Sequence, residues 1–60
     1  MKYKTIHELA GSYINGNISY VKGKVKRMSK IDFVSLLEEI KNFGYNENDS
    51  YLELACKLLN

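Results

Sequence analysis

The densest group of chemically active side chains in this 60-residue sequence is a basic run between residues 17 and 30. Lysine ammonium groups neutralise phosphates, and arginine can also bond a guanine base through two parallel N–H groups. Serine and tyrosine hydroxyls are further partners for phosphate oxygens. The residues that we expect to contact nucleic acid are Ser19, Tyr20, Lys22, Lys24, Lys26, Arg27 and Lys30. Gly23, in the middle of the run, would let the backbone approach nucleic acid closely.

The charges are unevenly distributed along the chain, although the formal net charge is only +2. Residues 1–30 contain seven lysines and arginines against one carboxylate, a net charge of +6, whereas residues 31–60 contain two lysines against six carboxylates, a net charge of −4. This asymmetry predicts a basic binding surface. A solvated lysine-rich face, an acidic protein partner or an electrostatic match between the two halves would give the same pattern.

Other reactive side chains are sparse and favour no catalytic chemistry. His7 and Cys56 could form a base and nucleophile pair, but we expect His7 to be exposed and Cys56 to act as a small hydrophobic residue. Asp32, Glu38 and Glu39 could form an acid-base pair or a cation site, yet helical spacing predicts that they face solvent. The sequence has no metal-ligand spacing. We therefore expect a non-enzymatic protein with no catalytic residues, metal or cofactor.

Three segments carry the capping-box pattern of a helix start, namely residues 5–8, 29–32 and 50–53. Apolar residues recur after each at helical spacing, and Asn15-Gly16 and Gly44 stand where helices end. The pattern predicts one all-α domain over residues 1–60, with four short helices at about 5–14, 18–28, 30–43 and 50–59. The predicted core consists of Leu9, Ile14, Val21, Val25, Phe33, Leu37, Ile40, Leu52, Ala55 and Leu59.

Residues 12–27 allow two interpretations. As a helix capped by Asn17, residues 18–28 place Ile18, Val21, Val25 and Met28 on one stripe. As strands, they would form a hairpin around Asn15-Gly16, because Asn-Gly is a strong two-residue turn signal, and the fold would be α+β. We favour the helix, since no third strand is visible to support a hairpin.

The helical interpretation gives a helix, a short turn and a basic helix, the pattern of a helix-turn-helix. The segment TIHELA, residues 5–10, resembles the opening of many bacterial helix-turn-helix segments, and the resemblance extends over about the first 28 residues. It implies that Ala10 packs against the following helix and that residues 18–28 enter the major groove of DNA. The glycine of such turns usually stands four residues after the alanine, whereas here that position is Ile14 and the glycine is Gly16.

The length and composition favour a small cytoplasmic protein that associates with a partner. A domain of this size buries only about 60% of its unfolded surface, so a homodimer or a bound partner is a fair expectation. We expect neither a signal peptide nor a membrane-spanning segment, because no apolar run is long enough, and one cysteine fits a reducing compartment. The leading hypothesis is a regulatory DNA-binding protein. The alternative is a helical protein-interaction module or inhibitor, of a size typical of phage and mobile-element accessory proteins.

Overall fold

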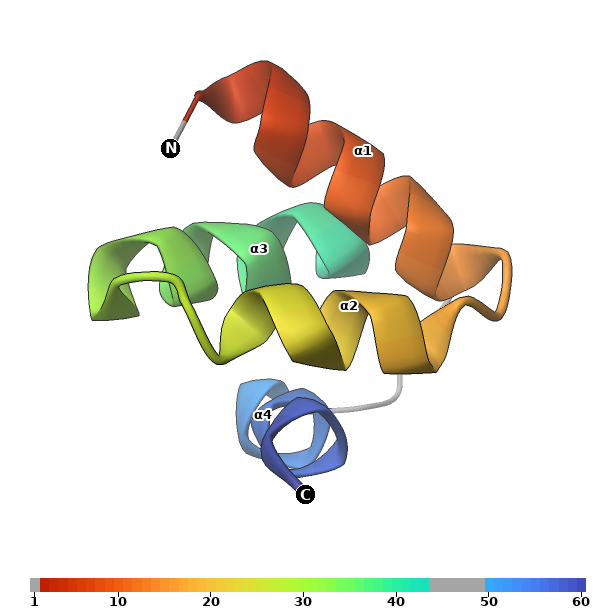
Figure 1. The fold of residues 1–60 in the computed structure, drawn as a ribbon, viewed down its shortest axis with the longest axis vertical. Coiled ribbons are helices and arrows are strands. Elements are labelled where there is room, and N and C mark those ends of the chain that lie inside the picture. Colours follow the sequence, from red (N-terminus) through yellow and green to blue (C-terminus); the bar gives the residue numbers. More distant parts are fainter. Residues whose placement is uncertain (1, 44–49) are drawn as a thin grey trace.

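A computed structural model describes residues 2–43 and 50–60, which form four helices (Figure 1). They are α1 (Tyr3–Ile14), α2 (Ile18–Val25), α3 (Lys30–Asn42) and α4 (Tyr51–Leu59). The all-α prediction is therefore confirmed, and the α+β alternative is wrong because residues 12–27 contain helix on both sides of a turn. No helix in the described ranges is both long and apolar enough to cross a bilayer.

Helix α1 begins two residues earlier than the sequence predicts. Lys2 is the N-cap, and its carbonyl accepts a hydrogen bond from the Ile6 amide at 3.1 Å. Thr5 consequently lies inside the helix, and the predicted capping box at Thr5 is not formed. The additional turn brings Tyr3 onto the same side as His7, with their ring centroids 6.1 Å apart.

The Asn-Gly segment ends α1 as a Schellman motif. Gly16 has φ +92°, the left-handed conformation that glycine adopts without steric cost. The Gly16 amide bonds the Tyr13 carbonyl at 3.1 Å, and the Asn17 amide bonds the Ser12 carbonyl at 2.9 Å. The same dipeptide that favours a β-hairpin here stops a helix, because the residues before it are already helical.

Helix α2 is shorter than predicted, since it ends at Val25 and not at residue 28. The amides of Arg27 and Met28 bond the carbonyls of Lys24 and Val25, three residues back, at 3.0 and 3.3 Å. This tighter turn lets Met28 pack against the core before α3 begins. The predicted cap at Asn17 makes no side-chain hydrogen bond.

The starts of α3 and α4 are confirmed. Ser29 Oγ accepts from the Asp32 amide at 3.2 Å, and Ser50 Oγ accepts from the Glu53 amide at 3.1 Å. Helix α3 ends at Asn42, one residue before the predicted end. Gly44, the glycine expected to end this helix, lies outside the described residues.

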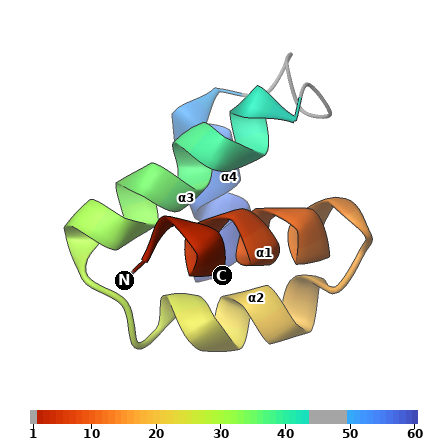
Figure 2. The same ribbon diagram turned by 90° about the horizontal axis from the view of Figure 1, so that it is seen from above.

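Helices α1 and α2 lie side by side and run in opposite directions, joined by the short turn at residues 15–17 (Figures 1 and 2). They form an αα-hairpin, in which a short turn joins two helices, and in Figure 1 they draw apart away from that turn. Helix α3 packs against α1 and α4, and α4 also packs against α2. Ala10 is fully buried, as the helix-turn-helix resemblance implies.

The core lies where the four helices meet. Half of the predicted core is confirmed as buried, and Ile14, Phe33 and Ala55 pack against it while partly exposed. The buried apolar residues are Ile6, Leu9, Ala10, Tyr13, Val21, Val25, Leu36, Leu37, Ile40, Leu54 and Leu58. The prediction is wrong for Leu52 and Leu59, which are 74% and 64% exposed, because α4 turns Leu54 and Leu58 inward instead.

Candidate nucleic-acid interface

The basic residues of α2 lie on the outside of the molecule. Figure 2 shows α2 along one edge, with α1 and α3 on its inner side. Val21 and Val25 are buried, which turns the opposite face of the helix to solvent. Six of the seven predicted contact residues are exposed, namely Ser19, Tyr20, Lys24, Lys26, Arg27 and Lys30, and Lys22 is half-buried.

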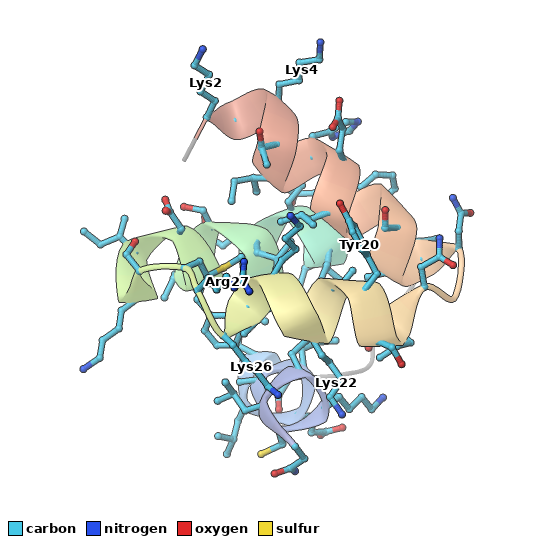
Figure 3. The ribbon with its side chains drawn as sticks, in the orientation of Figure 1. Lys2, Lys4, Tyr20, Lys22, Lys26 and Arg27 are labelled. Atoms are coloured by element: carbon cyan, nitrogen blue, oxygen red, sulfur yellow. The ribbon has the colours of Figure 1, made fainter. Side chains whose placement is uncertain are left out.

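The exposed face of α2 has two sides that differ in their surroundings (Figure 3). Tyr20 and Arg27 extend toward α1, and Lys22 and Lys26 extend toward α4. Ser19 and Gly23 lie between the two sides, since they line the shallow hollow on each.

The side toward α1 combines basic side chains with hydroxyl groups. A hollow of about 290 Å³ is lined by Ser19, Tyr20, Gly23, Lys24 and Arg27. Lys24 Nζ lies 5.6 Å from the centroid of the Tyr20 ring, a cation–π arrangement. The lining therefore combines two cations with two hydroxyl groups.

The side toward α4 is engaged with the protein itself. Its hollow contains Leu58 and Leu59 beside Lys22 and Lys26. Lys22 Nζ donates a hydrogen bond to the backbone oxygen of Asn60. Lys22 and Lys24 also stand in the last turn of α2, where cations interact favourably with the helix dipole. Lys22 thus has a structural role that the sequence pattern did not reveal.

The remaining basic residues of the N-terminal half do not join this surface. Lys30 belongs to α3, where it lines a separate hollow with Ile31, Val34 and Ser35. Lys2 and Lys4 extend from the N-terminal end of α1, far from the labelled side chains of α2 (Figure 3). The charge of +6 in residues 1–30 is therefore spread over at least three places.

A second polar cluster, which the sequence did not predict, joins α1 to α3. Glu39 was expected to face solvent, but it is only 6% exposed. Its Oε2 accepts a hydrogen bond from His7 Nδ1 at 3.1 Å, and its carboxylate also accepts from the Tyr3 hydroxyl. The His7 ring lies between Tyr3 and Phe43, with centroid distances of 6.1 and 5.3 Å. We call Tyr3, His7, Glu39 and Phe43 the α1–α3 cluster.

Hydrogen bonding controls the proton affinities in the α1–α3 cluster. The Tyr3 hydroxyl, followed by the His7 ring, lowers the pKa of Glu39, because both donate to the carboxylate. The same contact raises the pKa of Tyr3, since its phenol is hydrogen-bonded to a carboxylate. The sequence contains one signal for this cluster, the i,i+4 spacing that places Tyr3 and His7 on the same side of a helix. It contains none for Glu39, which joins the cluster through the packing of α3 against α1.

The described residues offer little to other kinds of site. They contain no group of three or more histidine, cysteine, aspartate or glutamate side chains arranged to hold a metal. Cys56 was expected to act as a small hydrophobic residue, but it is an exposed free thiol on α4. His7 Nδ1 is hydrogen-bonded to Glu39. Asp32 and Glu38 line a hollow beside Glu39, together with Ser35 and Asn42.

Comparison with known proteins adds no family assignment. No protein-family model, no curated protein and no solved structure matches this chain. The two candidate interaction surfaces are therefore the outer face of α2 and the exposed apolar residues of α3 and α4.

Proposed function

We propose that this chain is a non-enzymatic regulatory protein that binds nucleic acid, in the first place DNA, through the outer face of α2. The observation that carries the proposal is the composition of that face. The exposed Gly23 is surrounded there by lysines, an arginine, a serine and a tyrosine. These are the side chains that contact phosphate and sugar in protein–DNA complexes.

The arrangement of the helices favours contact with the backbone over reading of base edges. Helix α2 packs against both α1 and α4, so only its outer face can meet DNA. Phosphate contacts need only exposed cations and hydroxyl groups, which α2 supplies. The binding is expected to depend strongly on salt and weakly on sequence.

Fluorescence anisotropy of a labelled mixed-sequence DNA duplex, titrated at several salt concentrations, tests the proposal. We expect log affinity to fall linearly with log salt concentration, with a slope of about −0.9 per phosphate contact. The double variant K26Q/R27Q should bind more weakly and with a shallower slope. Unchanged affinity and slope in K26Q/R27Q, or no binding by the unaltered protein at low salt, would refute the proposal.

A second candidate function, a protein-interaction module, is favoured by exposed apolar side chains. Leu52, Leu59 and Ile31 are 74%, 64% and 79% exposed, and Tyr51 is half exposed. Leucine, isoleucine and tyrosine at such positions are typical of surfaces that another protein covers. A stoichiometric partner recovered by affinity purification after nuclease treatment, and lost in L52Q/L59Q, would support this function. If nuclease treatment abolishes the recovery of that partner, the association depends on nucleic acid, and the protein-interaction function is refuted.

A further inference from the structure

We infer that one phosphate group of the nucleic-acid backbone binds in the hollow on the α1 side of α2, between Tyr20 and Arg27. This inference rests on the proposed function and narrows it to one side of the helix. It assigns the affinity chiefly to Lys24 and Arg27, and a minor part to Lys22 and Lys26.

The chemistry of the hollow matches a phosphodiester. Arg27 and Lys24 supply two positive charges, and Ser19 and Tyr20 supply hydroxyl donors. No carboxylate lines this hollow. The nearest acidic lining is Glu8 of α1, in the adjoining hollow that shares Tyr20 and Lys24. Charge-assisted bonds of this kind are among the strong hydrogen bonds of proteins.

Gly23 supplies the second argument, because nothing in the fold requires a glycine at this position. A Cβ added to Gly23 would meet no atom within 4 Å, and among residues 2–43 and 50–60 the positive φ is at Gly16. Glycine is among the least favourable residues in the interior of a helix. Because Gly23 has no side chain, a phosphate can approach the backbone of α2 closely between Ser19 and Arg27.

The opposite side of α2 is less suited to an anion. Lys22 already donates to the Asn60 backbone oxygen, and apolar side chains of Leu58 and Leu59 line the same hollow. Lys26 remains as an exposed cation there. The two sides therefore carry equal formal charge but unequal capacity to hold a phosphate.

Two double variants with the same loss of charge separate the two sides. Anisotropy titrations with a mixed-sequence DNA duplex are expected to show an affinity loss of about tenfold or more for K24Q/R27Q, with a smaller loss for K22Q/K26Q. The salt slope should fall by about 1 for each phosphate contact removed. K2Q/K4Q, which removes the same charge at the far end of α1, is the control and should change affinity least.

Glycine replacement gives a test that does not depend on charge. G23A should raise the melting temperature, because alanine favours helix, and should still weaken DNA binding several-fold. G11A is the matched control, since a Cβ at Gly11 on α1 also meets nothing within 4 Å. It should raise the melting temperature without changing affinity.

The possible failures are distinguishable. Equal losses in K24Q/R27Q and K22Q/K26Q, or full affinity in a stabilised G23A, would overturn the phosphate site while leaving nucleic-acid binding intact. No DNA binding by the unaltered protein would overturn both proposals. Binding to vesicles of anionic phospholipid in place of DNA would also overturn both, because the phosphate would then belong to a lipid headgroup.

Discussion

His7 Nδ1 lies 3.1 Å from Glu39 Oε2 and so connects α1 to a carboxylate that is almost fully buried on α3. The two residues are 32 positions apart in the sequence, and their contact lies in the packing between α1 and α3. A buried carboxylate is tolerated where hydrogen bonds replace its lost hydration. Tyr3 and His7 provide those bonds, which makes the cluster a determinant of how α1 is held.

The lowered pKa of Glu39 predicts a loss of stability in acid. Because the folded state holds the carboxylate more acidic than its ordinary value of 4.5, the unfolded state binds more protons at low pH. The contribution of Glu39 is fully present above pH 4.5 and disappears as the pH falls through the lowered pKa. Urea unfolding at a series of pH values should show this decline.

Glu39→Gln and Glu38→Gln form the matched pair for this prediction. Each removes one carboxylate from α3, but Glu38 is exposed whereas Glu39 is buried. The decline in acid should become shallower in Glu39→Gln and stay as it is in Glu38→Gln. An equal effect of both variants would attribute the decline to net charge and not to the α1–α3 cluster.

Tyr3→Phe should remove the largest single cause of the lowered Glu39 pKa while keeping an aromatic ring beside His7. The pKa of Glu39 is then expected to move up toward its ordinary value, so the part of the acid-dependent loss of stability that Glu39 causes becomes smaller. Carboxyl chemical shifts followed by NMR during an acid titration measure this directly. A Glu39 titration midpoint that does not move would show that the Tyr3 hydroxyl bond does not form in solution.

The sequence predicted the start of a helix correctly where the capping hydrogen bond joins two residues of the same four-residue segment. Ser29 and Ser50 bond amides three positions ahead, and no other part of the chain is needed for that contact. Thr5 has the same pattern but is overridden, because Tyr3 gains tertiary contacts by extending α1. The burial of Glu39 could not be predicted from local sequence either, because it depends on the packing of α1 against α3.

The sequence predicted which residues of α2 are exposed but not how their surroundings differ. The stripe of Val21 and Val25 fixes the inward face, and the outward residues follow from it, namely Ser19 and Gly23 on the helix and Arg27 in the turn after it. The separation of Lys24 from Lys22 into two hollows depends on where α1 and α4 pack. No periodicity within α2 contains that information.

The caps give a stability prediction with an internal control. Ser29→Ala and Ser50→Ala should each lower the free energy of unfolding by about 1 kcal/mol, because each leaves a helix N-terminal amide without its partner. Thr5→Ala should change it by less than about 0.5 kcal/mol, since Thr5 is exposed and caps no helix. Chemical denaturation of the three variants is the measurement. A cost at Thr5 equal to that at Ser29 would mean that α1 begins at Thr5 in solution.

Adjacent leucines of α4 give the sharpest test of how that helix is oriented. Leu58 is 2% exposed and Leu59 is 64% exposed, although Leu59 was the one predicted for the core. Leu58→Ala should destabilise the fold by about 2–5 kcal/mol through lost burial and a cavity, whereas Leu59→Ala should cost less than about 0.5 kcal/mol. Thermal and urea unfolding of the two variants compare the same chemical change at neighbouring positions. A reversed order would mean that α4 is rotated about its axis, with Leu52 and Leu59 in the core and Leu54 and Leu58 outside. The apolar surface offered to a protein partner would then be a different one.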